Sequence, residues 1–257
     1  MGRPLLIATA ARLLLAGAVW PASNALTQQA VPEEPPSSER SLDPFEQKVR
    51  EFLLNNPEVI VEAMQILQER QRAAEAENLK RAIAARRDDL LGDPDAPVGG
   101  NPSGDVTLVE FFDYNCPYCR RVAPTVVELE EADPDLRLVY KEFPILGPGS
   151  TFAARAALAS RKQGKYLAFH NALMQAREQL AKDQVKKIAA AVGLDTDRLQ
   201  EDMNDPAIEQ TIQRNLDLAN ALGITGTPSF VIGDQVVPGA ADLRTLQRMI
   251  AHARQSE

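Results

Sequence analysis

The stretch that decides the fold reads Phe111-Phe112-Asp113-Tyr114-Asn115-Cys116-Pro117-Tyr118-Cys119, and it holds both cysteines of a 257-residue chain. The run 106–112 is apolar, β-branched or aromatic, which is typical of a buried strand. Behind the cysteines, apolar residues recur at helical spacing: Val122, Val126, Val127 and Leu129. The pattern predicts a strand, a short turn and a helix that begins at the first cysteine.

This placement favours thiol chemistry. A cysteine at a helix N-terminus lies among unpaired N–H groups and the positive end of the helix dipole, which favour the thiolate. We therefore expect Cys116 to be an exposed nucleophile. Cys119 lies one turn inside the helix, close enough to attack a mixed disulfide on Cys116. Pro117 suits the first helical turn, where its missing N–H is not needed.

The cysteine pair has two alternative interpretations, both structural rather than catalytic. A structural disulfide across two residues closes too small a loop to stabilise the fold much. A zinc site needs four ligands, and the two histidines, His170 and His252, are far away in the sequence. The sequence favours a redox pair over both.

The N-terminus predicts export. Arg3 and Arg12 flank a run of small and leucine residues without acids, and Ser23-Asn24-Ala25 offers small residues for a signal peptidase. The alternative is a membrane anchor, but the uninterrupted apolar run 13–20 is too short to span a bilayer. We expect residues 1–25 to be a signal peptide cleaved near Ala25, with the mature protein in the periplasm.

Charge excludes some partners. Removing residues 1–25 takes away two of the 28 basic residues and none of the 36 acidic ones, which leaves a net charge of -10. Such a chain does not suit nucleic acid or an anionic membrane surface. In an oxidising compartment, a cysteine pair is plausible as a site of disulfide exchange.

The region before residue 92 divides into a predicted tether and predicted helices. Residues 26–42 are rich in Pro, Glu, Ser and Gln and cannot bury a core. A first helix is expected to begin at Asp43-Pro44 and to be interrupted by Asn55-Asn56. Asn56 can cap a second helix, which has Pro57 at its first position and runs to about Leu91.

This helical region, 43–91, has apolar residues that a short helical hairpin cannot bury: Phe45, Val49, Phe52, Leu53, Ile60, Met64 and Leu67. One interpretation is a long helix packed along its own domain. The other is self-association through a bundle of identical copies, which fits heptad-like spacing. The two remain open on the pattern alone.

The remaining chain, 92–257, predicts a catalytic domain. Residues 92–104 are expected to be a linker, and 136–143 a second strand ended by Pro144. A helical block covers about 149–222. A hairpin at 229–237 and a helix at 241–253 follow.

Three motifs in this order resemble the DsbA-like thiol-disulfide oxidoreductases. They are the stretch 111–119, Lys141-Glu142-Phe143-Pro144-Ile145-Leu146-Gly147, and Gly223-Ile224-Thr225-Gly226-Thr227-Pro228-Ser229-Phe230. The helical residues Phe52-Leu53-Leu54-Asn55-Asn56-Pro57-Glu58-Val59 resemble the ScsC branch. The resemblance implies an α/β thioredoxin fold with a helical insertion, preceded by an α-helical oligomerisation region that forms a trimer.

The resemblance also implies roles for single residues. Thr227-Pro228 matches a cis-proline loop opposite the redox pair that binds substrate backbone; without the resemblance it reads as an ordinary turn. Glu110 matches a buried acid near the resolving cysteine, whereas the pattern alone also allows a solvent-facing strand residue. Pro117 and Tyr118 stand between the cysteines, where a histidine in the second position marks strongly oxidising members.

We therefore expect an exported protein disulfide isomerase or reductase. Its substrates would be proteins with cysteines or disulfides, and a membrane protein of the DsbB or DsbD type would reset its redox state. No cofactor is expected beyond the Cys116–Cys119 disulfide. The alternatives are a monomeric dithiol oxidase, a protein that binds Cu(I) through its paired thiolates, and a non-catalytic surface or adhesion protein.

Overall fold

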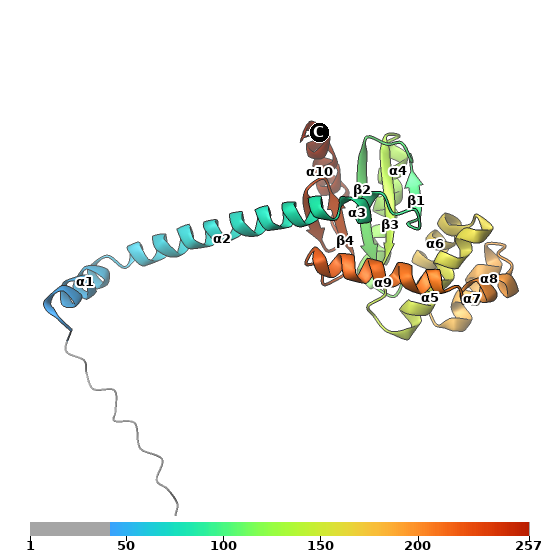
Figure 1. Cartoon of the computed structure of the whole chain (residues 1–257), viewed down its shortest axis with the longest axis horizontal. Helices are drawn as coiled ribbons and strands as arrows, with labels where there is room; N and C mark the ends of the chain where they lie inside the picture. The colour runs from blue at the N-terminus through green and yellow to red at the C-terminus, as the bar shows by residue number, and fades with distance from the viewer. Residues whose placement is uncertain (1–41, 257) are drawn as a thin grey trace, which may run out of the picture. The chain divides into compact units, whose positions relative to one another are not determined.

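The computed structural model describes residues 42–256, and the predicted signal peptide and nearly all of the predicted tether lie outside this range. The chain divides into two compact units at Ile60–Val61. The first contains α1 (Pro44–Asn55) and the first residues of the next helix, and the second contains the rest of that helix, the sheet and the remaining helices (Figure 1). No helix within residues 42–256 combines the length and apolar character needed to cross a membrane.

Helix α1 begins as predicted. The Asp43 carboxylate accepts hydrogen bonds from the backbone N–H groups of Phe45 and Glu46, and Glu46 accepts one from Asp43 in return. The predicted role of Asn56 is wrong. Its side chain donates to the carbonyl of Phe52 and so closes the end of α1, instead of capping the start of the next helix.

The long helix expected from Pro57 to Leu91 is in fact two helices, α2 (Glu58–Ala85) and α3 (Arg87–Leu91). The chain leaves helical geometry at Arg86, which has φ -111° and ψ 17°. The break carries no proline or glycine. It accompanies the burial of Leu90 beside the sheet, so tertiary packing ends this helix rather than a local signal.

The sheet has five strands in the order β1-β3-β2-β4-β5. β2 (Val106–Phe112) pairs in parallel with β3 (Leu136–Glu142). On its other side, β2 pairs antiparallel with β4 (Ser229–Ile232), and β4 pairs antiparallel with β5 (Gln235–Pro238). The edge strand β1 (Val98–Gly100) lies inside the predicted linker. Its three residues, two of them glycine, are too short a run to show a strand pattern.

Helices cover both faces of the sheet (Figure 1). Side chains alternate along β2, so Leu108 and Phe112 face one core while Val109 and Phe111 face the other. The first core includes residues of α4 (Pro117–Ala132) and α10 (Leu243–Ser256). The second includes residues of α2, α3 and α9 (Pro206–Ala221).

A helical insertion follows β3. It comprises α5 (Pro148–Ser160), a 3-10 helix at Arg161–Gln163, α6 (Tyr166–Met174), α7 (Lys182–Ala191) and α8 (Thr196–Asp202), and it leads into α9. Alanines of α5 are buried at its centre, where small side chains let neighbouring helices approach closely. The expected thioredoxin fold with a helical insertion is confirmed.

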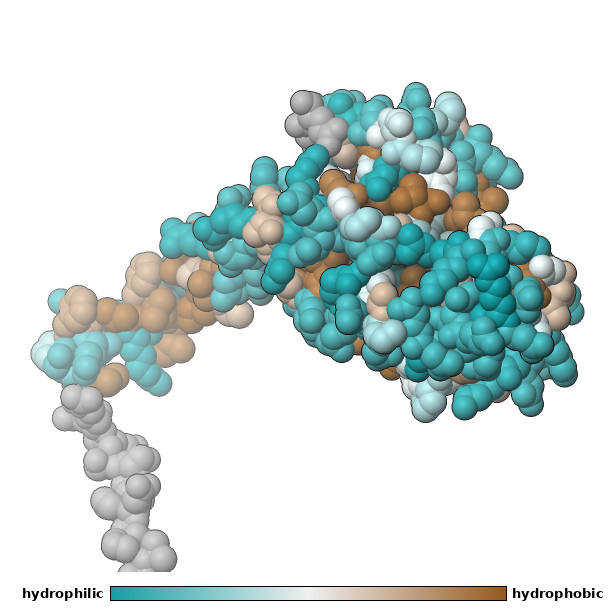
Figure 2. Space-filling view, turned by 45° about the vertical axis from the view of Figure 1, so that its right-hand side comes forward, coloured by the Kyte–Doolittle hydropathy of each residue, from teal (hydrophilic) through white to brown (hydrophobic). Residues whose placement is uncertain are grey.

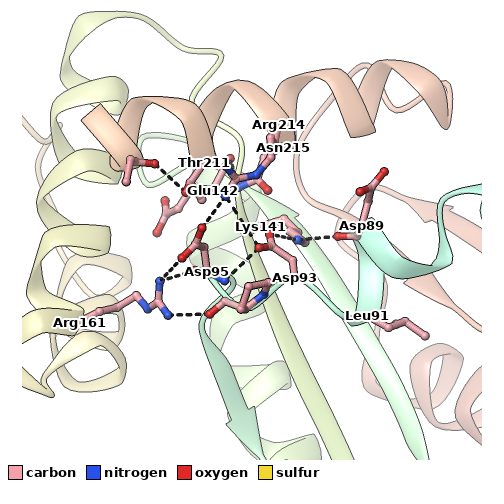
Figure 3. A network of polar contacts seen from close by, with 12 residues as sticks. Asp89, Leu91, Asp93, Asp95, Lys141, Glu142, Arg161, Thr211, Arg214 and Asn215 are labelled. Atoms are coloured by element: carbon pink, nitrogen blue, oxygen red, sulfur yellow. Dashed lines mark hydrogen bonds and ion pairs between the residues drawn. The ribbon is translucent and has the colours of Figure 1, made fainter. Parts of the chain in front are cut away.

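Polar contacts fix the segment between α3 and β1 (Figure 3). The ammonium of Lys141, only 1% exposed, donates to the carbonyl of Asp89 at 2.8 Å and to Asp93 Oδ2 at 2.7 Å. Arg161 donates to the backbone carbonyl oxygens of Pro94 and Asp95. The predicted linker is therefore held against the domain over this segment.

Candidate redox active site

The cysteine pair lies where β2 gives way to α4. Cys116 is the N-cap of α4 and Pro117 its first residue, as the spacing predicts. Cys119 is fully buried. The expectation that Cys116 is exposed is wrong: it is 4% exposed, while its neighbour Tyr118 is 53% exposed.

The loop before β4 lies against Cys116. The Cys116 thiol donates a hydrogen bond to the backbone carbonyl of Thr227 at 3.2 Å. The Thr227–Pro228 peptide bond is cis, as the family resemblance implies. Two stretches 111 residues apart therefore meet at the sulfur atom, which places a carbonyl acceptor beside the proposed nucleophile.

Cys119 is protonated over the physiological pH range. Burial raises the pKa of its thiol strongly, and the negative charge of Glu110 raises it further. A buried thiol of this kind attacks slowly unless a neighbouring group accepts its proton.

Glu110 has the position and the chemistry of a group that accepts the proton of Cys119. It lies on the face of β2 that carries Leu108 and Phe112, and thus faces the core of α4. The side chain is 3% exposed, and its Oε1 atom has no hydrogen-bond partner. Burial raises the pKa of this carboxyl to about 8. The solvent-facing alternative for Glu110 is therefore wrong.

The turn before Cys116 is braced by residues that the sequence argument did not single out. Asp113 Oδ1 accepts from the N–H of Asn115 at 2.7 Å, and Asp113 Oδ2 accepts from the N–H of Leu146 at 2.9 Å. Arg120 donates from Nε to the carbonyl of Tyr114 at 2.7 Å. An Asp directly after a strand is a local signal for such a turn. No local sequence signal predicts the contact between Asp113 and Leu146.

Asn115 joins the redox turn to the helical insertion. Its Oδ1 atom accepts from the N–H of Leu180 at 2.7 Å, and its Nδ2 donates to the carbonyl of the same residue at 3.2 Å. Arg120 also donates to this Oδ1, at 3.2 Å. Residues of the helical insertion, which is not part of the sheet, thus hold the redox turn in place.

Metal ligands are sparse around the thiols. Within the described part of the chain, no cluster of three or more His, Cys, Asp or Glu side chains is arranged to hold a metal ion. Cys116 and Cys119 themselves remain the pair that could bind a soft, low-coordinate ion such as Cu(I).

The strand order and the thiol pair at the start of α4 define a thioredoxin-fold protein. Residues 107–251 match the DSBA-like thioredoxin domain, and residues 43–74 match the copper resistance protein ScsC N-terminal domain. The chain therefore belongs to the DSBA-like thioredoxin family of oxidoreductases, in its ScsC-like branch.

Solved structures agree with this assignment. A thioredoxin-like oxidoreductase from Silicibacter pomeroyi DSS-3 is 56% identical, with a TM-score of 0.66, over 66% of this chain and 99% of that one. A linker-deletion mutant of Proteus mirabilis ScsC is 31% identical, with a TM-score of 0.68, over 86% of this chain and 100% of that one. The second match extends into the N-terminal helices.

The curated relatives are much longer proteins. The Na(+)/H(+) antiporter NhaA 3 of Salinispora tropica is 30% identical over 164 residues, which are 63% of this chain. The match spans 25% of that protein's length. The region similar to this chain is therefore only one part of the antiporter.

Proposed function

We propose that this protein is an exported thiol-disulfide oxidoreductase that isomerises or reduces disulfides in other proteins. One observation carries the proposal: Cys116 lies at the start of α4 against the Thr227 carbonyl, with Cys119 one turn behind it. The isolated carboxyl Glu110 is close enough to influence that second thiol. Nucleophile, resolving thiol and proton acceptor are thus present together.

The reaction begins at Cys116. Its thiolate attacks one sulfur of a substrate disulfide, forms a mixed disulfide and expels the other substrate sulfur as a thiolate. In isomerisation, a thiolate of the substrate attacks the mixed disulfide, forms a new substrate disulfide and releases the Cys116 thiolate. No net oxidation or reduction occurs on this route.

Reduction uses the second cysteine. The thiol of Cys119 gives its proton to Glu110 in its ionised form, which is the minor form at neutral pH because its pKa is about 8, and the resulting thiolate attacks the Cys116 sulfur of the mixed disulfide. The Cys116–Cys119 disulfide forms, and the substrate leaves as a dithiol. Two electrons from a membrane partner of the DsbD type then restore the reduced enzyme.

The N-terminal helices favour isomerisation over simple oxidation. In the single chain, α1 and the start of α2 expose large apolar side chains; Phe45 is 74% exposed. Figure 2 shows this apolar surface in brown along the N-terminal helices. We propose that three copies assemble through it, so that several redox sites face one client, with residues 68–78 as an arm between the assembly helices and the redox domain.

A second candidate is a monomeric dithiol oxidase that is recharged by a partner of the DsbB type. Strongly oxidising relatives have a histidine at the position that Tyr118 occupies between the cysteines. Tyr118 therefore argues against a strongly oxidising Cys116–Cys119 pair. Binding of Cu(I) by the thiol pair is proposed as a secondary role, supported by the match of residues 43–74 to a copper resistance domain.

The decisive experiment is refolding of a scrambled multi-disulfide protein in a glutathione buffer. The full mature chain should accelerate recovery of the native protein, and Cys116→Ser should abolish the acceleration. Cys119→Ala should keep part of it, because isomerisation does not consume the second thiol. Recovery at the same rate with Cys116→Ser and with wild type would rule out the proposal.

Copper binding is tested separately. Wild type and Cys116→Ser are titrated with Cu(I) in competition with a chromophoric chelator. Tight binding of one ion by wild type and at least tenfold weaker binding by the variant is expected for a two-thiolate site, where roughly 1.4 kcal/mol corresponds to tenfold. Equal binding would remove the thiol pair as the copper site.

A further inference from the structure

A buried polar cluster lies behind the redox turn and has no part in the reaction described above. Tyr114 Oη donates to Glu142 Oε1 at 3.0 Å, and Tyr166 Oη donates to the same oxygen at 2.9 Å. The Nδ1 atom of His170 lies 3.0 Å from Tyr114 Oη. All four side chains are buried, and we call them the Tyr–Glu–His cluster.

The cluster forms a directed chain of hydrogen bonds. Burial lowers the pKa of His170 to about 3, so the imidazole is neutral at physiological pH. With its proton on Nδ1, His170 donates to Tyr114 Oη, which leaves the tyrosine's own proton for Glu142. Glu142 is held by its strand, which pairs with β2 at Phe112, and Asn215 Nδ2 donates to its carbonyl. The chain therefore ends on a fixed acceptor.

Tyr114 connects this acceptor to the redox turn. It stands two residues before Cys116, and its carbonyl accepts the hydrogen bond from Arg120 on the first turns of α4. The neighbouring carbonyl, that of Asp113, accepts from the N–H of Cys116 at 3.0 Å. The bond from the Tyr114 hydroxyl thus adds a buried anchor to the backbone that carries Cys116.

We propose that Glu142 is a positioning residue for the redox reaction, and that it acts through the Tyr114 hydroxyl to hold Cys116 at the start of α4 against Thr227. The inference rests on the proposed thiol chemistry of Cys116 and adds a residue that never touches the substrate. Glu142 is separated from the redox pair by more than twenty positions in the sequence.

Tyr166 supplies a matched control. It makes the same kind of bond to the same Glu142 oxygen, but it comes from α6 of the helical insertion, and its interaction with the redox turn is with the Tyr114 hydroxyl itself. Loss of either hydroxyl leaves one bond to Glu142. Only the loss of the Tyr114 hydroxyl removes the bond that links the redox turn to Glu142.

The test measures the rate at which iodoacetamide alkylates Cys116 as a function of pH, in full-length protein carrying Cys119→Ala. Tyr114→Phe is expected to slow the reaction near neutral pH by about tenfold, the change that corresponds to one lost hydrogen bond of about 1.4 kcal/mol. Tyr166→Phe should stay within about twofold of the reference. Glu142→Gln, which keeps an acceptor oxygen, should behave like the reference, and Glu142→Leu like Tyr114→Phe.

Each outcome decides the inference. Equal rates for Tyr114→Phe and Tyr166→Phe would show a structural role only and overturn it. If circular dichroism shows that Tyr114→Phe does not fold, the two Glu142 variants decide: a slow Leu variant beside a fast Gln variant supports positioning, and equal rates overturn it. A reference protein whose Cys116 reacts no faster than a free cysteine defeats the proposed function itself, and the inference with it.

Discussion

At the scale of single residues, Glu110 makes the stability of the protein depend on pH. Its carboxyl has a pKa of about 8 in the folded protein, against an ordinary value of 4.5. Between these two values the folded chain binds a proton that the unfolded chain has lost. The stability that Glu110 contributes is therefore complete below pH 4.5 and is lost as the pH rises through 8.

His170 acts in the opposite sense in another window. Its pKa falls from 6.5 to about 3 on burial, so its contribution is present above pH 6.5 and is lost as the pH falls towards 3. From about pH 7 to 8, most His170 side chains are neutral in both the folded and the unfolded state. This interval isolates the effect of Glu110 from that of His170.

Glu110→Gln should therefore flatten the pH dependence of the unfolding free energy between about pH 7 and 8. The wild-type slope due to this residue is at most about 1.4 kcal/mol per pH unit. Urea unfolding of the reduced protein at several pH values measures it. Parallel curves for wild type and variant would contradict the burial of this carboxyl.

At the scale of elements, the ion pair of Lys141 and Asp93 joins β3 to the segment between α3 and β1. The two side chains are 1% and 9% exposed, and Asp93 also lies 3.9 Å from Arg214. Burial raises the pKa of Asp93, but the hydrogen bond and charge of Lys141, with further contacts, outweigh it and hold the pKa below its ordinary value. The pair is thus ionised and enclosed.

Asp93→Ala should destabilise the fold by about 3–5 kcal/mol, because it leaves a buried ammonium without its counter-ion. Lys141→Met should cost less, since Asp93 keeps Arg214 nearby and the apolar stem is replaced by one of similar volume. Chemical denaturation measures both changes.

The exposed pair of Lys80 and Asp234, whose side chains are 59% and 48% exposed, provides the control. Lys80→Ala should change the unfolding free energy by less than about 1 kcal/mol. An Asp93→Ala variant no less stable than Lys80→Ala would show that the buried pair does not anchor the segment.

At the scale of the whole molecule, the exposed apolar side chains of residues 45–67 predict assembly. Each large apolar side chain that becomes buried contributes roughly 1.5–3 kcal/mol, so several per copy can offset the entropy lost on association. Light scattering should give a trimer for the mature chain. Phe45→Glu combined with Phe52→Glu should shift it to the monomer, whereas Gln71→Ala on the polar part of α2 should not.

Assembly and activity are then compared in one truncated protein. Deletion of residues 43–78 should give a monomer whose Cys116 still exchanges with small disulfides. It should lose disulfide isomerisation, because a single site has no second site to hold a misfolded client. A truncated form that unscrambles substrates at the full-length rate would separate assembly from isomerase activity.

Short-range patterns in the sequence were enough to predict much of this molecule. The apolar run 106–112, the cysteine spacing and the turn residues are local signals, and they led to the strand, the redox helix and the hairpin where the structure has them. Asp43 and Pro44 likewise predicted the start of α1, because a cap acts within one turn.

Tertiary structure alone decided the rest, because burial and long-range contact depend on which elements pack together. The pattern left Glu110 open between solvent and core, and only the packing of α4 and α10 over that face of β2 excludes water and raises its pKa. The cover over Cys116 comes from a loop 111 residues away. The break at Arg86, the strand β1 and the bond from Tyr114 to Glu142 have no local signal, since each exists only when distant segments supply the partner.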